Sequence, residues 1–393
     1  MATDSTSTSR APARPSSSTS DGLFDGIYAR GDVAAAVGGD AWLQAMLDVE
    51  AALARACAAE GLIPRAAAEA IGAACRIDAV DGEAIARATA DHASPVVPLV
   101  RALRDAVGGD AADHVHHGAT SQDIVDTAAS LVARRALDPL LRDARSAMDA
   151  AARLADDHRA TPVMGRTLLQ QAVPTSFGLK AAVWLNAIAD ATAWVADTGT
   201  RALAVQMGGP VGSRSPAVAA HVARALELAD PVIPWHTNRA RPAGLASSLG
   251  ALAGALAKVA GDVILLSQTE VGEVREGGGP DRGGSSAMPH KRNPVASVSI
   301  VACTQRVPAL VAAVFSALPQ EHERAAGRWQ SEWGTISELL ALTGSTAAWG
   351  AELLGGLQVD AERMRANLGD AEPDLGAAGE LIDRALSAYR ASP

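Results

Sequence analysis

Three segments of the chain repeat small or apolar residues at intervals of four and three, a spacing that only a helix places on one face. The first runs through Leu137, Leu141, Ala144, Met148, Ala151 and Ala155. The second runs through Phe177, Ala181, Trp184, Ile188, Ala191 and Val195. The third runs through Leu245, Leu249, Leu252, Leu256, Val259, Val263 and Leu266. This is the seam of left-handed helix packing, so we predict an all-α bundle of long helices that oligomerises. The third helix is predicted over residues 245 to 276, roughly 48 Å at 1.5 Å per residue.

Composition agrees with a soluble helical protein and excludes several classes. Of 393 residues, 48% are hydrophobic and only 3% aromatic, which suits helices with small seam residues. The formal net charge of −10 argues against binding to nucleic acid, and we predict that no run is long or apolar enough to span a membrane. Cys57, Cys75 and Cys303 stand far apart, which argues against a disulfide framework and for a reducing, cytoplasmic compartment.

The patterns also divide the chain. Residues 1–20 are rich in Ser, Thr and Pro and lack the apolar stretch of a signal peptide, which predicts a disordered tail. Residues 21–106 are predicted to form an N-terminal helical domain, with short helices over 42–104 and a restart at Pro64. Residues 107–350 hold the seams and are predicted to form the central bundle.

A glycine-rich stretch, "GGGPDRGGSSAMPHKRNP" from Gly277 to Pro294, follows the third seam. Its glycines allow positive φ and let backbone N–H groups approach a ligand, while Lys291 adds positive charge. A solvent-exposed linker is the alternative, and a P-loop is excluded because GxxxxGK[ST] is absent. Glu270 and Glu273 continue the seam spacing just before the stretch, so that helix end either leaves the core for water or lines a polar cavity.

Several of these segments resemble the fumarase/aspartase superfamily. "GSSAMPHKRNP", Gly284 to Pro294, matches its signature GSSxMPxKxNP at every defined position. "HHGATSQDIVDTA", His116 to Ala128, is similar to its first motif, HxGxTSxD, and "GRTLLQQAVP", Gly165 to Pro174, resembles its second. "TEVGEVRE" and "HERAAGRWQSEW", which begin at Thr269 and His322, resemble segments of carboxymuconate cycloisomerases and adenylosuccinate lyases.

The resemblance implies a three-domain, all-α protomer whose long central helices form the core of a homotetramer, with each active site assembled from motifs of three subunits. Relative to the family, residues 351–393 look like an abbreviated C-terminal helical segment. The implied chemistry is β-elimination, or its reverse, on a small polycarboxylate, with no cofactor. A loop serine takes the proton, and by position in the motif that serine is Ser285.

The resemblance also assigns roles along the motifs. The catalytic candidates are Ser285, Lys291 and Asn293. The candidates for substrate binding are His116, Thr120, Ser121, Arg166, Thr167, Gln170, Ser286, Arg324 and Arg328. A serine hydroxyl is too weak an acid to act as a base unless N–H groups and a cation stabilise its anion, which the loop and Lys291 can supply. For Arg166, capping a helix end is an equal alternative to binding a carboxylate.

Leu168 is the most informative departure from the family. Many of these lyases have a histidine there that assists departure of an amine or hydroxyl group, whereas a leucine moves no protons. A carboxylate, whose conjugate acid has a pKa of about 4, leaves unaided. The resemblance therefore implies a cycloisomerase that closes 3-carboxy-cis,cis-muconate to 4-carboxymuconolactone, in the protocatechuate branch of aromatic degradation. The alternatives are an adenylosuccinate lyase-like or argininosuccinate lyase-like enzyme, or a non-catalytic structural member.

Two further observations qualify the site. "WHTNRARPAG" resembles a family segment, but Asn238, Ala240 and Gly244 replace its three polar residues. His114, His116 and His117 suggest the histidine cluster of a metallohydrolase, but the acid and the final histidine of HxHxDH are absent. We therefore predict no metal site, with His114 and His117 in structural roles.

Overall fold

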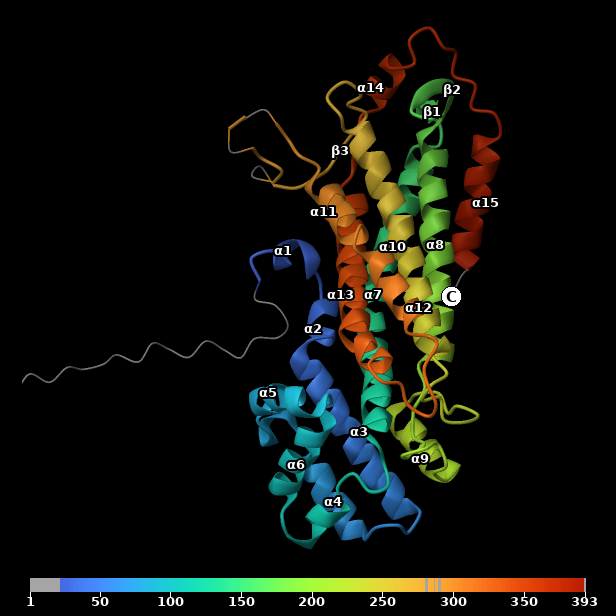
Figure 1. Cartoon of the computed structure of the whole chain (residues 1–393). Helices are drawn as coiled ribbons and strands as arrows, with labels where there is room; N and C mark the ends of the chain where they lie inside the picture. Colours follow the sequence, from blue (N-terminus) through green and yellow to red (C-terminus); the bar gives the residue numbers. More distant parts are fainter. Residues whose placement is uncertain (1–21, 280–281, 286, 289–290, 392–393) are drawn as a thin grey trace, which may run out of the picture.

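Long helices, laid side by side, carry the three predicted seams (Figure 1). In the computed structural model, which describes residues 22–391 apart from 280–281, 286 and 289–290, α7 packs against α8 and α13, and α10 packs against the same two helices. The long helices of the bundle are α7 (Ser121–Asp157), α8 (Phe177–Ala202), α10 (Ala240–Leu266) and α13 (Arg328–Gly355). Two shorter ones, α11 (Val295–Thr304) and α12 (Val307–Ser316), follow one another along α13. The all-α fold class is confirmed. The tail predicted for residues 1–20 lies outside the described residues.

The first two seams lie where the spacing predicted them. Ala144, Ala151 and Ala155 in α7 are fully buried, as are Trp184 and Ile188 in α8. The small alanine side chains of α7 let the neighbouring helices approach closely. Their burial explains why so small a share of aromatic residues suffices for a large core.

The third helix is shorter than predicted. It ends at Leu266 instead of residue 276, because Gln268 accepts hydrogen bonds from the backbone N–H groups of Val271 and Gly272 in a turn. Gly272 has a φ of +63°, which stops a right-handed helix. At 27 residues α10 is about 40 Å long. The prediction that Glu270 and Glu273 continue a helix was therefore wrong, and the chain enters a short strand instead.

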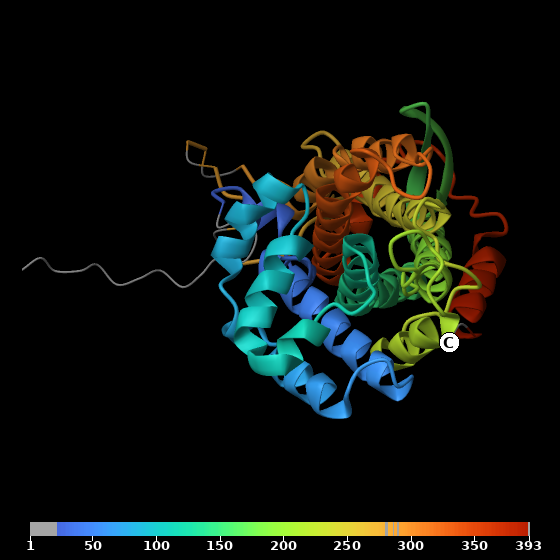
Figure 2. The same ribbon diagram turned by 60° about the horizontal axis from the view of Figure 1, so that its bottom comes forward.

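Smaller elements surround the bundle. The N-terminal helices cover one side of it (Figure 2). They are α1 (Asp25–Tyr28), α2 (Val33–Ala36), α3 (Gly39–Ala59), α4 (Arg65–Ala74), α5 (Gly82–His92) and α6 (Val96–Val107), with 3₁₀ turns at Ile77–Ala79 and Gly109–His114. Because α3 spans 21 residues, the prediction of only short helices here was wrong for that element. Pro64 does restart the chain, immediately before α4.

The few strands form two antiparallel pairs near one end of the bundle. Strand β1 (Pro162–Thr167) pairs with β2 (Gln170–Ser176), and β3 (Val274–Arg275) pairs with β4 (Gln358–Val359). Three further helices complete the chain: α9 (Pro216–Leu226), α14 (Ala361–Ala366) and α15 (Ala378–Ala391). All three cysteines are buried and unpaired, as their spacing indicated.

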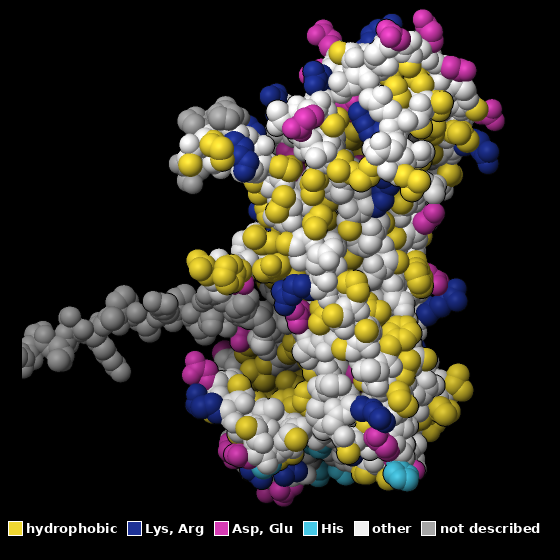
Figure 3. Space-filling view, turned by 45° about the horizontal axis from the view of Figure 1, so that its top comes forward, with side chains coloured by type: hydrophobic (Ala, Val, Ile, Leu, Met, Phe, Trp, Pro, Cys, Tyr) yellow, Lys and Arg dark blue, Asp and Glu magenta, His cyan; other side chains and the backbone are white. Residues whose placement is uncertain are grey.

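Two helical segments, Ala240–Leu266 and Val295–Ser316, are long and apolar enough to cross a membrane on composition alone, contrary to the prediction from the sequence. In the protomer both pack against neighbouring helices of the bundle. Much of α12 nevertheless faces outward: of its residues only Val307 and Val314 are buried. Figure 3 shows hydrophobic side chains scattered along the shaft of the molecule, with most charged ones toward its two ends.

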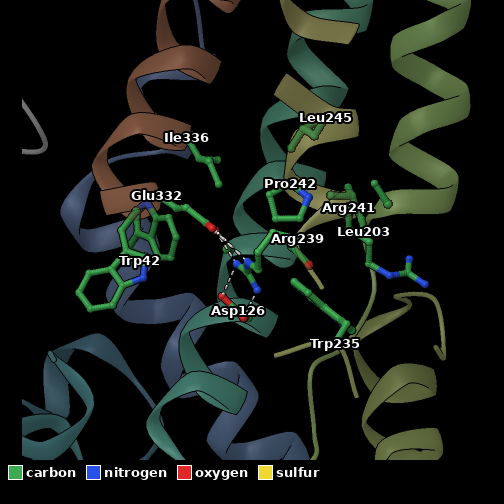
Figure 4. A pocket seen from close by; sticks show the side chains of 14 residues that line it. Trp42, Asp126, Leu203, Trp235, Arg239, Arg241, Pro242, Leu245, Glu332 and Ile336 are labelled. Carbon is green, nitrogen blue, oxygen red and sulfur yellow. Dashed lines mark hydrogen bonds and ion pairs between the residues drawn. The ribbon is translucent and has the colours of Figure 1, made fainter. Parts of the chain in front are cut away.

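A buried ion cluster ties three bundle helices together at one end (Figure 4). The guanidinium of Arg239 donates to both oxygens of Asp126 on α7, at 2.7 and 3.1 Å, and to both oxygens of Glu332 on α13. The three side chains are 3%, 2% and 1% exposed. Trp329 donates its indole N–H to Asp126 at 3.0 Å, and the ring of Trp235 lies 4.9 Å from the guanidinium carbon. Charges this deeply buried depend on their partners.

Replacing Arg239 is expected to destabilise the fold strongly. Arg239→Met leaves two buried carboxylates without their cation, which typically costs about 3–5 kcal/mol. Chemical denaturation followed by circular dichroism measures this free energy. Arg201→Met is the control, because Arg201 pairs with Asp197 at the surface, where such a pair contributes about 1 kcal/mol or less. Equal effects of the two substitutions would contradict a stabilising role of the buried cluster.

Candidate active site

The residues singled out in the sequence fall into two groups at opposite ends of the bundle. Thr120 and Ser121 lie at the start of α7, and Arg166 lies in β1, just beyond the end of α7. Since α7 has 37 residues, its two ends are about 55 Å apart. Figure 1 shows the separation: β1 and β2 lie at the top of the view, and the start of α7 lies near α9 at the bottom. Within one protomer the first and second motifs do not meet.

His116 marks the first end. Its Nδ1 lies 2.6 Å from Oε1 of Glu50, which is 1% exposed. Burial alone would lower the pKa of the His116 imidazole, but the nearby carboxylate of Glu50 and the charge of Asp123 raise the pKa above its ordinary value. His116 also has a φ of +63°, an unusual conformation for a non-glycine residue. A raised pKa increases the share of the imidazolium form at a given pH, and that form suits contact with an anion.

Thr120 and Ser121 begin α7, where unpaired backbone N–H groups and the helix dipole favour an anion. Thr120 caps the helix, and its own N–H donates to Asp123 at 3.1 Å in a reciprocal capping box. Asp123 is fully buried and also accepts from four other groups. They are Gln206 Nε2, the N–H groups of Gly208 and Gly209, and His236 Nε2, at 2.8 to 3.1 Å. Asp123 thus holds the helix start against a neighbouring loop.

Arg324 lies beside the same helix end, and Arg328 is held within its own segment. Arg324 Nε donates to the side-chain oxygen of Gln122 at 3.2 Å, which places a cation next to the first motif. Arg328 donates to Oε1 of Glu321 at 2.7 Å and to a backbone carbonyl. The pattern "HERAAGRWQSEW" gave no reason to separate these two arginines, because both stand in one charged run.

At the opposite end, Arg166 forms a two-pronged ion pair with Glu273. Its Nη1 and Nη2 lie 2.9 and 2.7 Å from the two carboxylate oxygens, and Glu273 is fully buried. Asn367 donates to the same carboxylate at 2.8 Å. In the protomer Arg166 therefore binds a carboxylate of its own chain, and Glu273 is buried instead of facing water.

The second motif forms a hairpin with an unusual turn. Thr167 pairs with Gln170, so the two turn residues are Leu168 and Leu169, with φ values of +51° and +64°. Positive φ at both positions normally selects Asn and Gly, and each leucine there stores strain on the order of 1–3 kcal/mol. The two side chains are also 95% and 72% exposed. The tip of the hairpin is thus both strained and exposed.

The loop that contains Ser285, called the serine loop here, connects β3 to α11. The hydroxyl oxygen of Ser285 accepts hydrogen bonds from the backbone N–H groups of Ala287 and Met288, at 3.3 and 3.2 Å. The N–H of Asn293 donates to Gly283 at 2.8 Å and closes the neck of the loop. Lys291 is exposed. Ser286, the other serine of the motif, lies outside the described residues.

Glu276, which was not predicted as a site residue, holds the two ends of this loop together. Its carboxylate accepts from the backbone N–H groups of Ala296 and Ser297, both at 2.8 Å, and from the Ser297 hydroxyl at 2.7 Å. A carboxylate in this position caps the start of α11 and joins the two ends of the loop. An acidic residue twenty positions before the capped N–H groups follows no local capping pattern, so only the fold reveals its role.

Asn238 of the substituted family segment and two of the three clustered histidines make contacts within the chain. Asn238 accepts from the N–H of Ala240 at 3.3 Å, and so helps to start α10. His116 is engaged by Glu50, as above, and the backbone carbonyl of His117 accepts from Arg214 at 2.7 Å. Among the described residues, no group of three or more His, Cys, Asp or Glu side chains is arranged to hold a metal ion.

The chain resembles known proteins over most of its length. A family model described as a lyase matches residues 30–308. The chain is 45% identical, over 356 residues, to a 3-carboxy-cis,cis-muconate cycloisomerase of Pseudomonas aeruginosa, covering 88% of this chain and 78% of the relative. It is 44% identical, over 364 residues, to a nitrosuccinate lyase of Streptomyces davaonensis, covering 88% and 77%.

Solved structures agree. The crystal structure of the 3-carboxy-cis,cis-muconate lactonizing enzyme from Pseudomonas putida superposes with a TM-score of 0.85 at 38% identity, covering 93% of this chain and 87% of that one. The helical architecture, the motifs and these matches lead to one conclusion: the chain belongs to this lyase family, within the fumarase/aspartase superfamily.

Proposed function

We propose that the protein is a cycloisomerase that closes 3-carboxy-cis,cis-muconate to a γ-lactone. The observation that carries the proposal is the surrounding of Ser285: its hydroxyl oxygen already accepts two backbone N–H groups. A serine anion needs such donors, because the free hydroxyl is too weak an acid to lose its proton at neutral pH. The relatives named as cycloisomerases support the choice of substrate.

The reaction balances without a cofactor. One carboxylate of the substrate attacks the double bond and forms the ring C–O bond, while the electron pair of the double bond moves onto a neighbouring carboxyl group. The resulting aci-carboxylate takes a proton at its α-carbon from the Ser285 hydroxyl. The serine anion, stabilised by the two N–H groups and by the charge of Lys291, then regains a proton from solvent. The reverse reaction uses the serine anion as the base.

Leu168 fits this reaction. In the reverse direction the leaving group is a carboxylate, a weak base that needs no proton donor as the C–O bond breaks. An amine or hydroxide leaves poorly without one, and leucine supplies none. The adenylosuccinate lyase-like and argininosuccinate lyase-like alternatives, both of which release a nitrogen group, are disfavoured for this reason.

Leu168 is also compatible with a second candidate function, that of a nitrosuccinate lyase. Elimination from nitrosuccinate, the substrate named for a relative at 44% identity, releases nitrite, which is also a weak base. Leu168 therefore does not distinguish a nitrosuccinate lyase from a cycloisomerase. Both reactions remove or add a proton next to a carboxylate, so both use Ser285 in the same way.

The active site is proposed to form between subunits of a homotetramer. The motifs lie about 55 Å apart in one protomer, a distance that a rigid helix fixes. The tip residues Leu168 and Leu169 are strained and exposed, and α12 carries an apolar surface that its own chain leaves largely uncovered. A second copy of the bundle supplies the cover for both. In this arrangement residues 107–350 form the shared core, flanked by domains 21–106 and 351–393.

The proposed arrangement assigns the remaining site residues. Ser285, Lys291 and Asn293 act from one subunit. His116, Thr120, Ser121 and Arg324 from one partner, and Arg166, Thr167 and Gln170 from another, surround the carboxylates of the substrate. Arg328 and Ser286 complete the set implied by the motifs. Net negative charge and the three unpaired cysteines support a cytoplasmic location.

The substrate is tested directly by ultraviolet spectroscopy. With 3-carboxy-cis,cis-muconate we expect loss of the absorbance of the conjugated diene as the lactone forms. Nitrosuccinate, with nitrite release as the readout, is the parallel test, and adenylosuccinate and argininosuccinate are the negative controls. Faster turnover of nitrosuccinate than of the muconate would replace the cycloisomerase by the second candidate.

Removing the catalytic hydroxyl is expected to slow the chemical step and to leave binding nearly unchanged. Ser285→Ala should lower kcat by about 10²- to 10⁴-fold with little change in KM, because proton transfer is lost and the substrate contacts remain. Ser286→Ala, one residue further along, should cost less. If Ser286→Ala proved the more damaging change, the serine assignment would be wrong even with the family correct.

Assembly is tested by light scattering. We expect a species of about four times the protomer mass of 39.9 kDa at the enzyme concentration used for assays. The physical reason is that no single bundle can bring the two ends of α7 together. An active monomer would rule out the shared site.

A further inference from the structure

A carboxylate near the end of α13 is shared between two arginines from distant parts of the chain. Oε2 of Glu352 pairs with Nη2 of Arg30, which follows α1, and Oε1 pairs with Nη1 of Arg282, in the serine loop. The side chains of Arg30, Glu352 and Arg282 are 40%, 28% and 26% exposed, so solvent screens the cluster only partly. Arg282 stands three residues before Ser285. The cluster therefore connects the serine loop to the bundle.

Trp349 forms the floor of this cluster. It lies one turn before Glu352 on α13 and is 5% exposed, and its indole N–H donates to the backbone carbonyl of Ile27 at 3.0 Å. The guanidinium carbons of Arg30 and Arg282 lie 4.0 and 5.7 Å from its ring centre. A cation over an aromatic face is attracted by the ring. Arg282 is thus held by a carboxylate and by an aromatic face at once.

Gly277 and Gly278 leave space for the Arg282 side chain to reach Glu352. Gly278 has a φ of +138°, and a Cβ atom built on it would lie 2.3 Å from Cδ of Arg282. A Cβ atom on Gly277 would lie 2.4 Å from the carbonyl oxygen of Gly356, at the end of α13. A side chain at Gly277 would push the loop off the helix, and one at Gly278 would displace the Arg282 side chain. The backbone is therefore built to let Arg282 fold back toward Glu352.

The neck that follows couples Arg282 to the serine. A Cβ atom on Gly283 would lie 2.3 Å from the carbonyl oxygen of Asn293, so the two strands of the loop touch there. The N–H of Asn293 donates to Gly283 at 2.8 Å, and Gly284 forms a β-bridge with Arg292. These bonds shape the loop but do not attach it to α13. Displacing Arg282 would move the neck, and with it Ser285.

We propose that Arg282, held by Glu352 and Trp349, is a positioning residue that sets the place of the Ser285 hydroxyl for proton transfer. The inference rests on the proposed function for the role of Ser285. Arg282 acts through the loop backbone and does not touch the substrate. An isolated ion pair of this exposure contributes little to global stability. Its effect is therefore expected in the geometry of the loop, where a displacement of about 1 Å can cost up to about 10²-fold in rate.

Kinetics of matched variants form the first half of the test. Arg282→Met and Glu352→Gln should each lower kcat about 10- to 100-fold with little change in KM, since binding does not depend on the serine. The double variant should fall no further than the worse single variant, because both changes break the same contact. Arg282→Lys, which keeps the charge, should recover part of the lost rate. Arg275→Met is the control, because Arg275 is exposed and bonds to Gln358 instead; it should retain the parent rate.

Hydrogen exchange forms the second half and does not require activity. In peptides that contain Gly283 to Ser285, Arg282→Met and Glu352→Gln should exchange faster than the parent, with unchanged exchange in α10 and α13. Unchanged exchange together with a kcat within twofold of the parent would overturn the positioning role and leave the proposed function intact. If the parent turned over none of the substrates, the proposed function would fail, and the exchange result would still decide whether the contact holds the loop.

Discussion

The length of one rigid helix governs this structure. Because α7 spans 37 residues without interruption, the groups at its start and those just beyond its end are about 55 Å apart. Although Pro139 lies inside α7, the helix is continuous from Ser121 to Asp157, and buried alanines pack it closely against its neighbours. Its two ends therefore stay far apart. The proposed sharing of the active site between subunits follows from this separation: the first and second motifs can act on one substrate only if they come from different copies of the chain.

Carboxylates organise both ends of the bundle, and two of them, Asp123 and Glu273, are fully buried. Asp123 gathers backbone N–H groups around the start of α7, Glu276 joins the two ends of the serine loop, and Glu273 fixes Arg166. Each is held by several donors, which is the condition for burying a charge. The groups proposed to bind or convert a substrate are thus positioned by other side chains of the same chain. Arg282 and Glu352 extend the same principle to a partly exposed site.

The motifs of the sequence identified the family and the candidate groups, but their partners came only from the fold. Glu50 stands 66 positions before His116, and Glu276 twenty before the N–H groups that it caps. No local pattern links residues so far apart. The end of α10 was misplaced for a related reason: Glu270 and Glu273 keep the seam spacing, whereas Gly272 and the turn bonds of Gln268 break the helix. Spacing alone does not show which of two competing signals prevails.

The sequence by itself determined the helical bundle, because period and residue size fix which faces pack. It also predicted the chemistry, because the serine motif and Leu168 favour a proton transfer with an unaided leaving group. Tertiary structure alone decided where these groups lie. It placed Glu50 beside His116 and Glu273 beside Arg166, and it attached the serine loop to α13 through Arg282. These are contacts between residues distant in sequence, and their geometry depends on how whole helices pack.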